Sequence, residues 1–189
     1  MSVTLETSRL ILRQWCDTDI DPWAEMNADP RVMEFFPALY DRARAEETAA
    51  SMRGEIERDG YGFWAVEIKA SGAFAGMIGL NEITYDIPVH PKREVGWRLA
   101  FDAWGHGYAT EGARASLQFA FDTLGWPEVV AFTAALNERS RRVMDRLGMV
   151  RDSDADFDHP RLKEGDALRR HVLYRIRRER AGGAVNTLA

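Results

Sequence analysis

The sequence predicts an α/β fold with a mixed sheet in a single domain. Segments with the apolar alternation of strands are interspersed with helix-like segments, in the order β-α-α-α-β-β-β-α-β-α-β-β. Of the 189 residues, 46% are hydrophobic, and six Trp, nine Phe and five Tyr side chains suit a sizeable core. We therefore expect one domain over residues 1–180 and a flexible tail over residues 181–189, which contains Gly182 and Gly183.

The N-terminal third is predicted to contain one strand and three helices. The strand covers Arg9–Trp15, because Leu10 and Leu12 share one face of it. Asp and Gly residues mark the helix ends, since Asp caps a helix N-terminus and Gly ends a helix. The first expected helix begins at Asp17 and has Pro22 in its first turn. The second covers Asp29–Phe35 and stops before Pro37, and the third covers Asp41–Arg58 and stops before Gly60.

The rest of the chain is predicted to contain six strands and two helices. Ser71 and Gly72 form a hairpin turn between the first two of these strands. The strands are expected over Gly62–Lys69, Phe74–Tyr85, Glu94–Phe101, Glu128–Leu136, Met149–Asp152 and Arg169–Arg177, with helices over Tyr108–Leu124 and Glu138–Leu147.

Charge and cysteine content exclude several protein classes. The formal net charge is -5, whereas a dedicated nucleic-acid-binding domain carries a cationic excess, so we expect no nucleic acid partner. Cys16 is the one cysteine, so no internal disulfide forms, and its place after the first strand suggests a packed residue. No apolar run is long enough for a signal peptide or a membrane helix. We expect a cytoplasmic protein with no membrane partner.

The segment from Glu94 to Glu111 carries the clearest chemical signal. It reads as a strand, a loop with Gly105 and Gly107, and a helix. Glycine backbone can approach a ligand closely, and the free N–H groups and dipole of a helix N-terminus attract an anion. A Walker A loop is excluded because Tyr108 and Ala109 follow Gly107 where Lys and Ser or Thr are needed. The alternative to a phosphate site is a structural turn at the start of the helix.

Six motifs in order give the family. They are Ser8-Arg9-Leu10-Ile11-Leu12-Arg13, Gly76-Met77-Ile78-Gly79-Leu80, Glu94-Val95-Gly96-Trp97, Trp104-Gly105-His106-Gly107-Tyr108-Ala109-Thr110-Glu111, Asn137-Glu138-Arg139-Ser140 and Leu147-Gly148-Met149. Over about residues 4–178 the chain resembles the GCN5-related N-acetyltransferase (GNAT) family. The branch that it resembles contains the ribosomal-protein N-terminal acetyltransferases.

This resemblance implies a fold and a cofactor site. The central sheet would be mostly antiparallel, with about six to seven strands flanked by helices. The strand that ends at Phe101 would splay from the strand near Val129, and the gap would receive the pantetheine arm of acetyl-CoA. The cofactor-binding residues that the resemblance implies are Leu99, Ala100, Phe101, Trp104, Gly105, His106, Gly107, Tyr108, Ala109, Thr110, Asn137 and Ser140. Asp102 departs from the Gln or Arg common before this glycine loop, but backbone binding should tolerate it.

The chemistry expected from the resemblance is acyl transfer from a thioester to an amine. Glu94 is the first candidate for the general base and Glu82 the second; either is otherwise a solvated or ion-paired strand carboxylate. A backbone N–H near Leu99 or Ala100 would stabilise the oxyanion. Relatives often carry a Tyr acid where this chain has Met144. Ser140 is the catalytic substitute for that acid, unless it only caps its helix or contacts CoA.

The expected function is therefore acetyl-CoA-dependent N-acetylation of a primary amine, by direct attack in a ternary complex. The acceptor is a protein N-terminus or a small-molecule amine, and a homodimer would fit the family. The alternatives are a catalytically silent acyl-CoA-binding module and a nucleotide-binding protein.

No metal is expected. His90, His106, His159 and His171 lack ligand spacing. The acidic loop Asp152–Asp158 departs from a calcium loop at Phe157 and Lys163, and we interpret it as solvated or lining the amine entrance. The arginines from Arg169 to Arg180 would form an exposed basic end that balances the acidic remainder of the chain.

Overall fold

The computed structural model describes residues 2–178, and its strands form one nine-stranded sheet. The sheet order is β1-β2-β3-β4-β5-β6-β9-β7, with β8 also paired to β9. All neighbours are antiparallel except β5 and β6, which are parallel. The strands are β1 (Leu5–Glu6), β2 (Leu10–Arg13), β3 (Phe63–Ile68), β4 (Ala73–Glu82), β5 (Arg93–Leu99), β6 (Glu128–Ala134), β7 (Val150–Arg151), β8 (Phe157–Asp158) and β9 (Arg170–Arg177).

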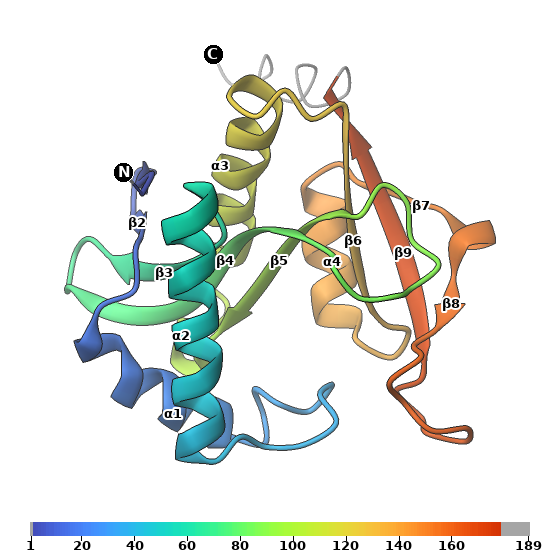
Figure 1. Ribbon diagram of the computed structural model, residues 1–189, viewed down its shortest axis with the longest axis horizontal. Coiled ribbons are helices and arrows are strands. Elements are labelled where there is room, and N and C mark those ends of the chain that lie inside the picture. The colour runs from blue at the N-terminus through green and yellow to red at the C-terminus, as the bar shows by residue number, and fades with distance from the viewer. Residues whose placement is uncertain (1, 179–189) are drawn as a thin grey trace.

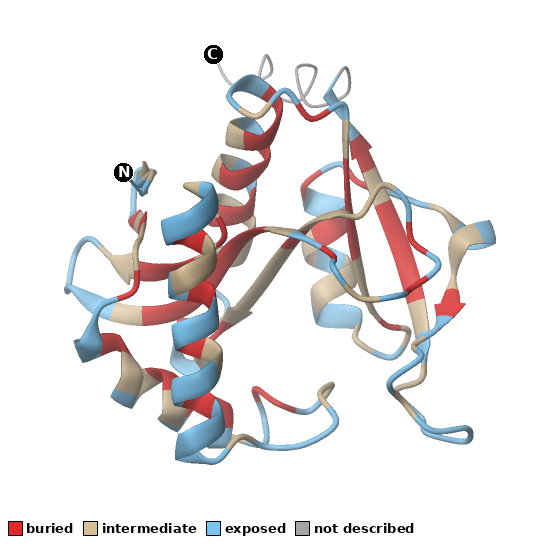
Figure 2. Ribbon diagram, in the orientation of Figure 1, coloured by how far each residue is buried: buried red, intermediate tan, exposed pale blue. Residues whose placement is uncertain are grey.

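Helices cover both faces of this sheet. The helices are α1 (Ile20–Ala28), α2 (Arg42–Asp59), α3 (Tyr108–Asp122) and α4 (Glu138–Arg146), with short 3₁₀ turns at Asp17–Asp19, Phe101–Ala103 and Ser153–Ala155. α1 and α2 lie on one face, and α3 and α4 lie on the other (Figure 1). Figure 2 shows buried positions recurring along α2, where Ala45, Ala49, Met52 and Ile56 have the spacing of one helix face. The predicted α/β class with a mixed, mostly antiparallel sheet is confirmed.

The buried side chains form two clusters. The larger contains Trp23, Trp64 and Ile78 and joins the strands from β2 to β6 to the helices. The smaller contains Val130 and Leu173 together with Ile83, Ile87 and Val89 from the loop after β4. The larger cluster also includes Val129 and Ala131 of β6 and Val172, Tyr174 and Ile176 of β9, so the core is continuous across the β5–β6 boundary.

β5 and β6 diverge toward their C-terminal ends, as Figure 1 shows. Within residues 2–178 they pair at a single bridge, between Glu94 and Val130. By contrast, β4 and β5 pair along the whole of β5, from Arg93 to Leu99. The predicted splay between the strand ending at Phe101 and the strand near Val129 is therefore present.

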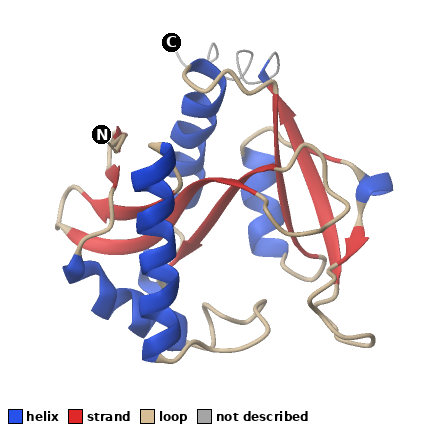
Figure 3. Cartoon of the chain, viewed as in Figure 1, coloured by secondary structure: helices blue, strands red, loops and turns tan. Residues whose placement is uncertain are grey.

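The short helix predicted over Asp29–Phe35 is wrong. Residues 29–38 form turns, drawn as a loop between α1 and α2 in Figure 3. The Asp29 carboxylate accepts the Arg31 N–H at 2.9 Å and pairs with the Arg31 guanidinium, so the residue read as a helix cap closes a local turn instead. Val32 and Met33 are buried against the core. Because the segment is too short to nucleate a helix by itself, this burial sets its conformation.

Other predicted boundaries differ by a few residues. β4 ends at Glu82 rather than Tyr85, because Ile83 leaves the sheet for the smaller cluster. β1 and β8 were not predicted, since a two-residue strand carries no alternation. The predicted tail over residues 181–189 lies outside the described residues.

Candidate active site

The glycine loop at the start of α3 presents a row of free N–H groups. Gly105 and Gly107 have φ values of +80° and +79°, in the left-handed region that disfavours other residues. α3 has no side-chain cap, and its first bond into the loop runs from the Glu111 N–H to the Gly107 carbonyl at 3.0 Å. Among residues 2–178, no acceptor lies within bonding distance of the N–H groups of Gly105, His106, Gly107, Tyr108, Ala109 and Thr110. The loop is thus built to accept an anion.

Arg9 and Glu111 tie this loop to the N-terminal hairpin. The Arg9 guanidinium donates to the His106 carbonyl at 2.9 Å and pairs with Glu111 at 2.5 Å. Glu111 also accepts the Thr7 hydroxyl at 2.6 Å and the Arg9 N–H at 2.9 Å. Sequence reasoning missed Arg9 as part of the site, although Arg9 and Glu111 both stood in the motifs that identified the family. Arg9 keeps 48% of its side chain exposed, which leaves a cation beside the loop.

The splayed end of β5 exposes unpaired peptide groups. The Ala100 N–H donates to the Ala75 carbonyl of β4 at 2.9 Å, so the prediction of Ala100 as an oxyanion donor is wrong. Neighbouring residues of a strand turn their peptide groups to opposite sides, so the N–H groups of Trp97 and Leu99 face β6. The Leu99 carbonyl is occupied by the Trp104 indole N–H at 2.9 Å. Of the two predicted donors, only the Leu99 N–H is available to a ligand.

Glu94 sits at the apex of the divergence, at the one bridge between β5 and β6. It is partly exposed, and one oxygen accepts the Asn81 side-chain amide at 2.8 Å. Burial of the carboxyl raises its pKa to about 7, and the Asn81 hydrogen bond only partly offsets that rise. The side chain exchanges its proton near neutral pH, as a general base must.

Glu82 lies on the opposite face of the sheet. Asn81 pairs with Glu94 and Glu82 with Arg93, and successive residues of a strand point to opposite faces. Glu82 is exposed and accepts the Tyr61 hydroxyl at 3.3 Å. The structure thus separates the two candidate bases, and only Glu94 shares a face with the α1–α2 wall of the site.

Ser140 and Met144 lie on α4, beside the splay, and Asn137 directly precedes that helix. The Asn137 side chain caps the helix, because its oxygen accepts the Ser140 N–H at 3.1 Å and its amide donates to the Thr133 hydroxyl at 3.0 Å. Among the described residues, the Ser140 hydroxyl has no hydrogen-bond partner, so it is free to meet a ligand. Met144 is 1% exposed and belongs to the larger cluster, so it replaces the family's Tyr with a core side chain.

The structure also gives the surroundings of Cys16 and of the acidic loop Asp152–Asp158. Cys16 is exposed, so its interpretation as a packed residue is wrong: the side chain points away from the core after β2 ends. The acidic loop is largely paired with the basic strand β9. Asp152 contacts Arg175 at 2.5 Å, and Asp158 contacts Arg170 at 3.4 Å. These ion pairs were not predicted, because the sequence suggested a solvated acidic loop; Arg180 lies outside the described residues.

Residues 2–178 contain no cluster of three or more His, Cys, Asp or Glu side chains placed to hold a metal ion. None of their helices combines the length and apolar character that crossing a membrane requires.

Comparisons with known proteins give the family. A family model described as an acetyltransferase (GNAT) domain matches residues 9–150. FsC-acetyl coenzyme A-N(2)-transacetylase of Aspergillus fumigatus is 31% identical over 189 residues, 93% of this chain and 77% of that protein. The uncharacterised protein YkkB of Bacillus subtilis is 30% identical over 148 residues, 77% of this chain and 84% of that protein.

Solved structures share the fold. An acetyltransferase from Agrobacterium tumefaciens superposes with a TM-score of 0.73 and 27% identity, covering 93% of this chain and 95% of that one. A putative ribosomal-protein-serine acetyltransferase from Vibrio cholerae has a TM-score of 0.76 and 16% identity, covering 94% and 99%. With the glycine loop and the splayed strands, these matches show that the chain belongs to the GNAT family and is an acetyl-CoA-dependent acyltransferase.

Proposed function

We propose that the protein is an N-acetyltransferase that moves the acetyl group of acetyl-CoA to a primary amine by direct attack in a ternary complex. The observation that carries this proposal is Glu94. Its carboxyl has a pKa of about 7 and stands where β5 and β6 part, on the α1–α2 face of the sheet. A carboxylate that gains and loses a proton near neutral pH can accept the proton of an attacking amine.

In this proposal acetyl-CoA occupies the splay and the glycine loop. The pyrophosphate lies on the N–H groups of Gly105, His106, Gly107, Tyr108, Ala109 and Thr110, whereas the predicted Trp104 N–H already donates to the Phe101 carbonyl at 3.0 Å. The pantetheine arm follows β5 along Leu99, Ala100 and Phe101 and meets Asn137 and Ser140 on the other side. The free loop N–H groups support the first placement, and the unpaired Leu99 N–H supports the second. Since Asn137 is engaged as a cap, its role is to hold Ser140 in place.

The reaction proceeds in three steps: deprotonation of the amine, its attack on the thioester and departure of the thiolate. Glu94 removes a proton from the ammonium, directly or through a water molecule, and the amine attacks the thioester carbonyl. The oxyanion gathers negative charge and is stabilised by the Leu99 N–H. The carbon–sulfur bond then breaks, the nitrogen of the intermediate gives up its second proton, and the departing thiolate, hydrogen-bonded by the Ser140 hydroxyl, takes up a proton to give CoA. The amide product keeps the new carbon–nitrogen bond.

The acceptor class is a small amine or a protein N-terminus. The relatives include an N(2)-transacetylase and a structure named for a ribosomal-protein serine, so both kinds are represented. The cytoplasmic location and the homodimer stay predictions.

The ternary complex is tested by initial rates of CoA release, measured over a grid of acetyl-CoA and amine concentrations. We expect double-reciprocal lines that intersect. Parallel lines, together with an acetylated protein found by mass spectrometry when amine is absent, would refute direct attack. Tight acetyl-CoA binding without CoA release for any amine in a broad panel would instead indicate a silent binding module.

A further inference from the structure

Arg98 is a half-buried cation, with its Nε atom fully buried, on the acceptor side of the sheet. It follows Glu94 by four residues on β5, so the two side chains share a face. Its guanidinium lies over the rings of Phe36 at 3.9 Å and Tyr40 at 5.3 Å, and it donates to the Asn27 side-chain oxygen. These partners come from α1 and from the loop before α2, which form one wall of the acceptor side.

Arg98 lacks the anion that a cation partly removed from water normally needs. Its Nε is buried without a hydrogen-bond partner, and no carboxylate within residues 2–178 forms an ion pair with it. Burial lowers the pKa of its guanidinium despite the neighbouring Tyr40. Aromatic faces and one amide offset only part of the cost of removing a full charge from water. The described residues around Arg98 supply no negative charge that balances its guanidinium.

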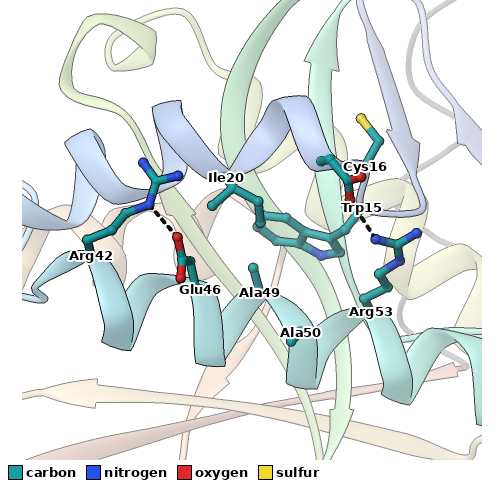
Figure 4. A pocket seen from close by; sticks show the side chains of 9 residues that line it. Trp15, Cys16, Ile20, Arg42, Glu46, Ala49, Ala50 and Arg53 are labelled. Atoms are coloured by element: carbon teal, nitrogen blue, oxygen red, sulfur yellow. Dashed lines mark hydrogen bonds and ion pairs between the residues drawn. The ribbon is translucent and has the colours of Figure 1, made fainter.

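The other cation-lined site in this half of the molecule makes a useful contrast. A cavity of about 340 Å³ between α1 and α2 is lined by Trp15, Ile20, Arg42 and Arg53 (Figure 4). There Arg42 pairs with Glu46 at 2.6 Å and Arg53 with Asp17 at 2.9 Å. Those cations are neutralised by the protein itself, so that cavity gives no comparable sign of a missing anion.

The surface between Glu94 and Arg98 is apolar. Gly96 stands between them on the same face, and the Phe63 ring covers it so closely that a Cβ at Gly96 would approach the ring to 2.9 Å. Four residues of strand separate the two Cα atoms by roughly 13 Å. A base, an apolar surface and a cation therefore follow one another along β5.

We propose that Arg98 binds a carboxylate of the acceptor, so that the preferred acceptor carries a primary amine and a carboxylate joined by several apolar bonds. This inference rests on the proposed function, because it assigns the amine to Glu94. The amine lies at Glu94, the linking carbons lie on Phe63, and the carboxylate meets Arg98 in the paired geometry that guanidinium and carboxylate favour. Two sources fit this chemistry: a free ω-amino acid, and a peptide N-terminus followed by an acidic side chain.

Binding to protein saturated with CoA tests the inference without requiring turnover. Calorimetry would compare 6-aminohexanoate with 6-aminohexanamide, and Gly-Glu-amide with Gly-Gln-amide. We expect at least one acid to bind tenfold or more tightly than its amide, and the preferred pair identifies the source. Arg98→Met should reduce this preference to less than twofold. Arg44→Met is the matched control, because Arg44 also lies over Tyr40 but is exposed and paired with Glu47.

Asn27→Asp separates ligand binding from a purely structural role of Arg98. The new carboxylate would replace the Asn27 oxygen that already accepts from Arg98 and would neutralise the cation within the fold. We expect this variant to retain CoA affinity while losing the preference for acids; its thermal stability should fall only by the loss of the bond from the Asn27 amide to the Trp23 carbonyl at 2.7 Å. If the preference survives in Asn27→Asp or Arg98→Met, Arg98 does not bind the carboxylate.

The remaining outcomes separate this inference from the proposed function. Equal affinity of the wild-type protein for acid and amide in both pairs, or no binding by any of the four, would overturn the inference. Selective acid binding without acetyl transfer to any amine would overturn the proposed function and leave the inference standing. Acetyl transfer with no preference for acids would overturn the inference about Arg98 and leave the proposed function standing.

Discussion

At the scale of single residues, the site depends on charges held where water is scarce. Glu94 and Arg98 share one face of β5, and burial shifts the pKa of both toward the uncharged form. Each has a neutral amide as its hydrogen-bonding partner, Asn81 and Asn27 respectively. Such environments cost folding free energy, and groups whose pKa is shifted in this way cluster at functional sites.

This cost predicts a stability change for Glu94→Gln. The Glu94 carboxyl has a pKa of about 7 in the folded protein against an ordinary 4.5, so the folded state holds the proton more tightly than the unfolded chain. The free energy of unfolding of the wild type therefore falls by as much as about 3 kcal/mol as the pH rises from about 4.5 to about 7. Above that range this contribution stays level. Glutamine avoids the charge and can still accept the Asn81 hydrogen bond.

Urea denaturation at several pH values measures this change. The free energy of unfolding of Glu94→Gln should exceed that of the wild type by roughly 1–3 kcal/mol at pH 8, with the difference vanishing near pH 4. Glu82→Gln, an exposed carboxylate on the opposite face, serves as the control and should show no such gain. A Glu94→Gln variant that is no more stable than the wild type at pH 8 would show that Glu94 is not desolvated.

At the scale of elements, the turn between β5 and α3 forms the proposed anion site. Two glycines at positive φ turn successive N–H groups toward one side, and α3 begins without a side-chain cap. The Arg9–Glu111 pair holds this arrangement from the N-terminal hairpin. The loop is thus preorganised by contacts on its far side, which leaves the N–H groups free.

Gly105→Ala should separate binding from stability. Nothing lies within 4 Å of a Cβ built at Gly105, so the new methyl would enter the space that a phosphate needs, and the +80° φ adds strain. We expect a loss of about 1–2 kcal/mol in the free energy of unfolding and a fall in acetyl-CoA affinity of about tenfold or more in calorimetry.

Gly125→Ala is the matched control for that variant. Gly125 has a φ of +66° and equally open space, but it lies in the turn between α3 and β6. It should lose similar stability and keep its affinity for acetyl-CoA. Equal loss of affinity in both variants would mean that Gly105 acts only through the fold.

At the scale of the whole molecule, local patterns predicted the layers and the glycine loop but not the surroundings of charged residues. Alternation located the long strands because each has one face on the core, as Leu10 and Leu12 show. Arg98 on a strand reads as a solvated charge, and only the packing of Asn27 and Phe36 against β5 removes it from water. The Arg9–Glu111 pair likewise joins residues 102 positions apart.

The errors have the same origin. Asp29-Pro30 carries the local signals of a helix start, yet the Asp29 side chain closes a turn and the core takes Val32 and Met33. Local propensity is a weak guide where tertiary contacts are available. The exposure of Cys16 also depends on how β2 leads into α1, which no local pattern specifies.

The most direct test of the account is the pH dependence of kcat/KM for acetyl transfer, compared between the wild type and Glu94→Gln. A base must be deprotonated to act, so wild-type kcat/KM should rise through pH 7 as the Glu94 carboxyl, with its pKa of about 7, loses its proton. Glu94→Gln should lose roughly 10²–10⁴-fold in rate and lose that rise, while binding acetyl-CoA as the wild type does. A Glu94→Gln variant with near wild-type kcat/KM and an unchanged pH profile would contradict the assignment of Glu94 as the base.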